Sequence, residues 1–257
     1  MHPALVYRGR FTWAAAVVLV LFPAQAWADK PLGGMKVEKI LFLGNSITLH
    51  PPLPERKWSG NWGMAASARE KDFVHVLTSQ IDSQTGGSLK LMLVDPTKKN
   101  ADGAVSLNDA NVVNIAEILE RKYASYEPEL LRAQLAARPD VVVLQFGENV
   151  RMDSFDAAAF TKSLKKLVSD LKESNNPTIF VTSQIYGPNE ALDRVKQQVV
   201  AEDPGHRVFV DLSGFGKDPS YNGFLSHPND QGMKFVADTI FKAMRSHQPP
   251  VETKSAN

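Results

Sequence analysis

The 257-residue sequence contains no cysteine. Disulfide bonds and lipid attachment through cysteine are both excluded, so the folded chain depends on its own hydrophobic core. The sequence also lacks an excess of either charge, with 29 basic and 28 acidic residues and a formal net charge of +1. Nucleic-acid-binding proteins usually carry a concentrated basic surface, so this balance argues against a nucleic-acid partner.

Metal-ligand spacing, internal repeats and low-complexity linkers are missing as well. The six histidines are scattered along the chain, and His75 and His206 have no partner at ligand spacing. The sequence therefore predicts a single domain that needs no metal and no other cofactor.

Long apolar runs are also scarce. The longest, at 11–21, is too short to span a bilayer comfortably. Arg8 and Arg10 precede it, and the small-residue segment Ala-Gln-Ala-Trp-Ala follows at 24–28. This order is typical of a secretory signal peptide, and an uncleaved membrane anchor fits the alanine-rich segment less well. We expect cleavage after Ala28, a secreted or periplasmic location, and no membrane contact after cleavage.

The remaining chain, 29–257, has a normal size for one α/β domain, and its formal charge is −1. Its polar, proline-broken tail at 247–257 is expected to fray. Short apolar runs alternate with segments whose apolar residues recur at helical spacing, which predicts a parallel sheet with helices on both faces. The expected strands are 40–43, 141–146, 178–182, 208–210 and one of 89–94 or 112–113, and the expected helices begin near 67 (after a capping box at Ser67–Glu70), 128, 155, 190 and 228.

Polar residues follow three of these strands. Ser46 comes just after the first strand and its terminal Gly44, Asn149 follows the strand at 141–146, and His227 lies between the last strand and the final helix. The carboxyl ends of parallel strands meet at one edge of a sheet, where ligands bind. A serine nucleophile needs a base, here His227, and donors for an oxyanion, here the Asn149 amide. Each residue alone fits a cap, turn or packing role better, but the ordered set favours a catalytic site.

The segments Gly44-Asn45-Ser46-Ile47-Thr48, Gly147-Glu148-Asn149 and His227-Pro228-Asn229 resemble the motif blocks of the SGNH hydrolase (GDSL esterase/lipase) superfamily. The resemblance covers essentially the whole of 29–257 and implies a single SGNH hydrolase domain. Its implied fold is a three-layer α/β/α, flavodoxin-like sandwich with a mostly parallel five-stranded sheet. It also implies that Ser46 is the nucleophile, that His227 is the general base, and that Ser46 and Asn149 belong to the oxyanion hole.

The sequence departs from this pattern at the triad acid. The family usually has an aspartate three residues before the histidine, where this chain has Phe224. Either a backbone carbonyl orients His227 in a Ser–His dyad, or Asp211 or Asp230 supplies the acid. We favour a turn role for Asp211 and a helix-cap role for Asp230.

A second departure concerns the backbone N–H of the family's second-block glycine. The matching context here is Asn114-Ile115-Ala116, so Ala116 is the expected third oxyanion donor. The alternative is Gly63, which has the expected residue type but precedes the first helix.

The loop after Ser46 contains Trp58, Asn61 and Trp62, which we expect to bind substrate. Flat aromatic side chains beside a nucleophile can pack on a sugar ring while polar groups bind its hydroxyls. The competing interpretation is that each tryptophan anchors the loop.

Together these features predict a serine hydrolase acting on carboxylic esters, without a cofactor. The expected substrate is a small acyl ester, for example an acetyl ester, on a small molecule or a carbohydrate. Two alternatives remain: a non-catalytic SGNH-like domain that binds a carbohydrate or a partner, and a polysaccharide O-acyltransferase.

Overall fold

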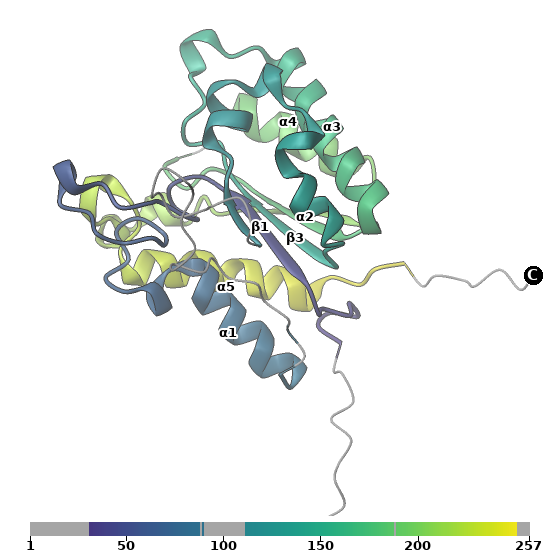
Figure 1. The fold of residues 1–257 in the computed structure, drawn as a ribbon, viewed down its shortest axis with the longest axis horizontal. Coiled ribbons are helices and arrows are strands. Elements are labelled where there is room, and N and C mark those ends of the chain that lie inside the picture. Colours follow the sequence, from purple (N-terminus) through teal and green to yellow (C-terminus); the bar gives the residue numbers. More distant parts are fainter. Residues whose placement is uncertain (1–30, 88, 90–110, 188, 251–257) are drawn as a thin grey trace, which may run out of the picture.

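A five-stranded parallel sheet forms the centre of the computed structural model, which describes residues 31–87, 89, 111–187 and 189–250 (Figure 1). The strand order is β2-β1-β3-β4-β5, and each neighbouring pair is parallel. The strands are β1 (Ile40–Gly44), β2 (Val112–Asn114), β3 (Val141–Gln145), β4 (Thr178–Thr182) and β5 (Arg207–Val210). Of the two candidates for the second strand, 112–113 forms β2, whereas 89–94 lies outside the described residues apart from Leu89.

Helices cover both faces of the sheet, as Figure 1 shows. In β1, Ile40 and Phe42 join the core on one face of the sheet, while Leu41 and Leu43 join the core on the other face. This alternation follows from the two-residue period of a strand and explains why its residues are apolar without interruption. The helices are α1 (Phe73–Thr85), α2 (Arg132–Ala136), α3 (Ala157–Asn175), α4 (Glu190–Ala201) and α5 (Asp230–Ser246). The predicted three-layer α/β/α fold with a five-stranded sheet is confirmed.

The predicted capping box at Ser67–Glu70 is wrong. Residues Arg69–Lys71 form a 3₁₀ turn, and α1 begins only at Phe73, with Asp72 as its cap. The buried Asp72 carboxylate accepts the backbone N–H groups of Gly63 (3.0 Å) and His75 (2.8 Å). A buried carboxylate needs such donors, so this network determines where the helix starts.

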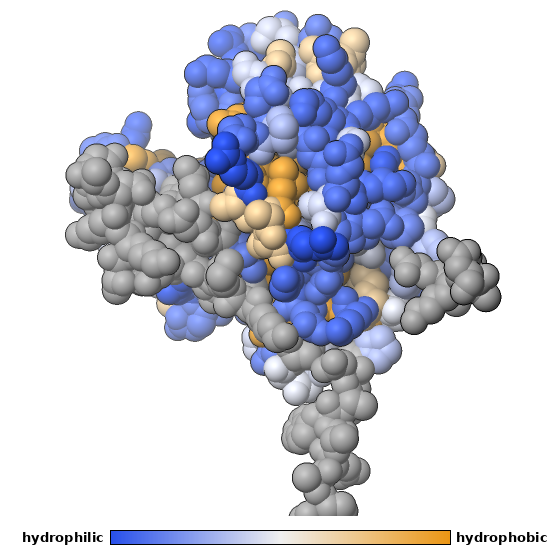
Figure 2. Space-filling view, turned by 45° about the vertical axis from the view of Figure 1, so that its right-hand side comes forward, coloured by the Kyte–Doolittle hydropathy of each residue, from blue (hydrophilic) through white to orange (hydrophobic). Residues whose placement is uncertain are grey.

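The surface seen in Figure 2 is mostly hydrophilic, with small hydrophobic areas. Among the described residues, no helix has the length and apolar character needed to cross a membrane. The expected signal peptide at 1–28 lies outside the described part of the chain, and so does the end of the expected tail, 251–257.

Candidate active site

The turn after β1 carries Ser46 to the carboxyl edge of the sheet. A Cβ atom at Gly44 would lie 1.9 Å from the Thr48 hydroxyl and 2.6 Å from the Gln145 carbonyl oxygen, so the turn requires glycine. The Asn45 side chain accepts the N–H of Ile47 at 2.9 Å, and its backbone carbonyl accepts that of Thr48. These bonds fix the turn around Ser46.

Ser46 and His227 are in direct contact. The Ser46 Oγ lies 2.7 Å from His227 Nε2, although 181 residues separate them in the chain. The other ring nitrogen, Nδ1, lies 3.0 Å from the backbone carbonyl oxygen of Leu225. A carbonyl only accepts, so Nδ1 carries the proton and Nε2 is free to accept the serine proton.

An unusual turn aims this carbonyl. Leu225 (φ 50°, ψ 38°) and Ser226 (φ 62°) are both left-handed, a conformation that costs a residue with a side chain about 1–2 kcal/mol. The turn is closed by bonds from His227 N–H to the Phe224 carbonyl (3.0 Å) and from Gly223 N–H to the His227 carbonyl (2.6 Å). The surrounding structure therefore holds the turn in the shape that orients the histidine.

Neither candidate acid bonds to His227 within the described structure. Asp211 accepts the N–H of Ser213 at 2.8 Å, which is a turn role. Asp230 accepts the N–H and the hydroxyl of Ser67, both at 2.7 Å, and Lys71 Nζ at 3.0 Å. The predicted helix-cap role of Asp230 is wrong, because the Asn229 side chain caps α5. Asp230 instead ties the start of α5 to the segment before α1.

We therefore expect Asp211→Asn and Asp230→Asn each to retain activity within roughly tenfold of the parent. Loss of a true triad acid costs about 10⁴-fold in turnover. The measurement is kcat on p-nitrophenyl acetate together with the melting temperature. A loss beyond about a thousandfold in either variant, with the fold intact, would identify that aspartate as the acid.

Ser46 and His227 border a cavity of about 260 Å³. Four predicted site residues line it: Ser46, Ala116, Asn149 and His227. The sequence prediction did not name the other lining residues as site residues: Asn114 ends β2, and the rest lie in loops or short helical turns, namely His50, Leu53, Met64, Arg121 and Leu225.

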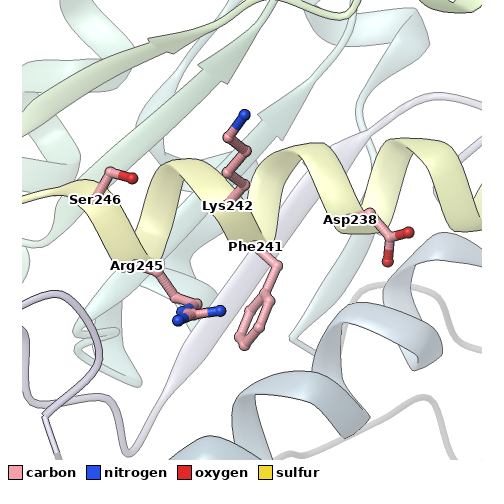
Figure 3. Close-up of a pocket in the computed structure, with 5 residues that line it drawn as sticks. All are labelled: Asp238, Phe241, Lys242, Arg245 and Ser246. Atoms are coloured by element: carbon pink, nitrogen blue, oxygen red, sulfur yellow. The ribbon is translucent and has the colours of Figure 1, made fainter.

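A larger hollow of about 460 Å³ lies along α5 and is lined by residues of that one helix (Figure 3). Lys242 points away from Phe241 and Arg245 there, and the strand ends do not contribute to it. Within the described residues, no group of three potential metal-ligating side chains lies close enough together to hold an ion. The polar side chains predicted to act in catalysis therefore lie at the cavity beside Ser46 and not at the hollow along α5.

Asn149 is oriented by hydrogen bonds at both ends of its amide. Its Nδ2 donates to Glu120 Oε2 at 2.6 Å, and its Oδ1 accepts from Arg121 at 3.3 Å. An amide nitrogen carries two hydrogens, so one remains available for an oxyanion at Ser46.

Of the two candidates for the further backbone donor, the structure brings Ala116 to the cavity. Its N–H donates to the Asn114 side-chain oxygen at 3.0 Å, so an oxyanion would have to share or displace this bond. The Gly63 N–H points elsewhere and donates to the buried Asp72.

The structure does not bring the two tryptophans to the cavity. Trp58 is 9% exposed and packs edge-to-face against Trp62, with ring centroids 5.5 Å apart. Their indole N–H groups donate to backbone carbonyls, from Trp58 to His50 (3.4 Å) and from Trp62 to Ala66 (3.0 Å). Asn61 and Trp62 line a separate hollow of about 10 Å³. This geometry favours the loop-anchor interpretation over the expected sugar-binding surface at Trp58, Asn61 and Trp62, because the two indole rings pack on each other and their N–H groups bond backbone carbonyls.

This anchor holds one wall of the cavity, since Trp58 and Leu53 exchange two backbone hydrogen bonds (2.8 and 3.2 Å). We expect Trp58→Ala to destabilise the protein by about 3 kcal/mol, because it removes a buried aromatic side chain. Hydrolysis of p-nitrophenyl acetate and of acetylated sugars should fall by the same factor. A selective loss on sugars at an unchanged melting temperature would contradict the anchor role.

Burial lowers the pKa of His227 below its ordinary value of 6.5, the Leu225 carbonyl opposes the shift, and nearby His50 adds to the lowering. A general base must be neutral, so a lowered pKa keeps His227 competent as the pH falls through 6.5. We expect the acid limb of kcat/KM to have its midpoint below pH 6.5. His50→Gln should move the midpoint upward, because it removes a source of repulsion. A midpoint at or above 6.5 in the parent would refute this assignment.

No family model matches the sequence, and a search of curated proteins found no match. Among solved structures, the psychrotrophic esterase EstA from Pseudoalteromonas sp. is 15% identical with a TM-score of 0.53, over 80% of this chain and 96% of that chain. A family two carbohydrate esterase from Clostridium thermocellum, solved with cellohexaose, is 18% identical (TM-score 0.47) over 84% of this chain.

The chain spans 64% of the length of the Clostridium protein. A family 3 carbohydrate esterase from Talaromyces cellulolyticus is also 18% identical (TM-score 0.45), over 80% of this chain and 95% of that chain. The Pseudoalteromonas match, with its TM-score above 0.5, shows that this chain shares the α/β fold of that esterase.

Proposed function

We propose that the protein is a serine esterase that hydrolyses small acyl esters, with acetyl esters of carbohydrates as the expected substrates. The observation that carries this proposal is the 2.7 Å contact between Ser46 Oγ and His227 Nε2 at a cavity that also presents the Asn149 amide. The fold shared with an esterase from Pseudoalteromonas sp. supports it.

In the proposed reaction, Ser46 Oγ attacks the ester carbonyl carbon while His227 Nε2 takes its proton. The resulting oxyanion accepts hydrogen bonds from the Ser46 N–H, the free hydrogen of the Asn149 amide and the Ala116 N–H. His227 then returns the proton to the departing alcohol, which leaves an acyl group on Ser46. Water attacks this acyl-enzyme with His227 again as the base.

The Leu225 carbonyl takes the orienting role that a carboxylate has in a full triad. It holds the Nδ1 proton in place and stabilises the imidazolium that forms during the reaction. Because a backbone carbonyl and not a carboxylate bonds Nδ1, the proposed site works as a Ser–His dyad, and the neutral carbonyl stabilises the cation less than a carboxylate would. With the signal peptide expected at 1–28, we propose that this activity acts outside the cytoplasm, on exported or environmental esters.

The proposal is tested with the purified chain, p-nitrophenyl acetate and an acetylated xylo-oligosaccharide. An alkyl fluorophosphonate, which reacts with activated serines, provides a second readout by peptide mass spectrometry. We expect acetate release from both substrates and a single label on Ser46. Absence of hydrolysis and of labelling would favour a non-catalytic binding domain. Acyl transfer to an added oligosaccharide in preference to water would show an acyltransferase instead.

A further inference from the structure

A buried carboxylate lies directly behind the oxyanion donor. Glu120 is 1% exposed and receives hydrogen bonds from three separate parts of the site. Its Oε2 accepts from the Asn149 amide at 2.6 Å. Its Oε1 accepts from the Asn45 amide at 3.0 Å and from the backbone N–H of Gly147. The carboxylate thus connects Asn45, the residue before the proposed nucleophile, with Gly147 and Asn149 in the segment after β3.

Each of these three partners is a donor. An ionised carboxylate accepts at both oxygens and donates from neither, so it satisfies all three at once. A glutamine of the same shape would place its NH₂ group against at least one of them, and two donors facing each other in a buried site repel. The contact set therefore requires a carboxylate and not merely a side chain of this size.

The local backbone explains how Glu120 reaches this position. Residues Ala116–Arg121 form a single π-helical turn, η3, closed by the bond from Lys122 N–H to the Glu117 carbonyl at 3.1 Å. The wider turn places Ala116, Glu120 and Arg121 on one side of η3. Ala116 and Arg121 line the cavity, while Glu120 lies beneath it and bonds Asn149.

We propose that Glu120 is a positioning residue that aims the free hydrogen of the Asn149 amide at the oxyanion and fixes the position of that amide relative to Ser46. This role rests on the proposed esterase activity. Glu120 does not touch the substrate, because its two oxygens are occupied by Asn149, Asn45 and Gly147. Its contribution to the reaction passes through Asn149.

The neighbouring Glu148 provides a matched control. Its Oε2 also accepts from the Asn45 amide, at 2.6 Å, and its Oε1 accepts from the Ile185 N–H at 3.1 Å. Burial and the nearby charge of Glu120 raise the pKa of Glu148. Glu148 therefore shares the environment and one partner of Glu120, but its described hydrogen bonds do not include the Asn149 side chain.

The test is a double-mutant cycle on the full chain. Glu120→Gln should lower kcat by roughly 10²-fold with a smaller change in KM, because a small misplacement of a catalytic group has a cost of this order. In the Asn149→Ala background, the same change should cost less than about tenfold, since the group it positions is already gone. Glu148→Gln should show the same effect in both backgrounds. An equal effect of Glu120→Gln in both backgrounds would overturn the positioning role.

A second readout does not depend on turnover. In the parent, the Asn149 side-chain amide hydrogen that bonds the Glu120 carboxylate should give a downfield ¹H–¹⁵N signal. That signal should move upfield in Glu120→Gln and remain in Glu148→Gln. If Glu120→Gln fails to fold, Glu120→Asp keeps the charge but shortens the reach, and it should weaken the same signal. An unchanged signal refutes the positioning role, whereas lack of hydrolysis by the parent refutes only the esterase proposal.

Discussion

Ser46→Ala is expected to reduce ester turnover by about 10⁶-fold, the scale seen when a nucleophilic serine is removed from a serine hydrolase. The change removes the atom that forms the acyl-enzyme and leaves the Asn149 amide and the His227 ring in place. It removes one hydroxyl at the rim of a cavity, so the melting temperature should remain close to that of the parent. Initial rates on p-nitrophenyl acetate and a thermal melt measure the two effects.

Ser67→Ala is the matched serine control. Ser67 is exposed and bonds Asp230 outside the cavity, so its loss should leave turnover unchanged. The Ser46→Ala protein should also fail to react with the fluorophosphonate, whereas the Ser67→Ala protein should react fully. Turnover by Ser46→Ala within a hundredfold of the parent would mean that another group is the nucleophile.

Asn149→Ala is expected to lower kcat by about 10²–10³-fold, the cost of losing one oxyanion donor. The donor acts on charge that develops during the reaction, so kcat and kcat/KM should fall together while KM changes little. Asn61→Ala is a suitable control, because Asn61 lines the separate small hollow and not the cavity at Ser46. A rise in KM at unchanged kcat would make Asn149 a substrate-binding residue.

The sequence predicted the sheet well, because buried parallel strands are short, uninterrupted apolar runs. The segments containing Ser46, Asn149 and His227 could be singled out because each follows a strand, and their order gave the resemblance. The contacts of Glu120 could not be predicted, since they depend on a π-helical turn that brings an acidic residue beneath two strand ends. His50 and Arg121 lie at the cavity for similar tertiary reasons and belong to no motif.

Two other expectations depended on tertiary contacts that the sequence alone does not show. A capping-box pattern at Ser67–Glu70 is a local signal. The helix instead begins after Asp72, because its buried carboxylate accepts hydrogen bonds from the backbone N–H groups of Gly63 and His75. Trp58 and Trp62 were compatible with a binding surface or with an anchor. Only the course of the loop decides this, because it turns one indole ring onto the edge of the other.

Because of the left-handed turn at Leu225 and Ser226, a main-chain carbonyl orients the His227 ring. A carbonyl does not titrate in the range where enzymes work, so the alignment of His227 should persist across pH while only its own ionisation varies. Point substitution cannot delete this carbonyl, as it can delete a triad aspartate. The Leu225 side chain, which is 48% exposed and lines the cavity, can therefore vary to fit different acyl or alcohol groups of the proposed substrates while the proposed base, His227, stays aligned.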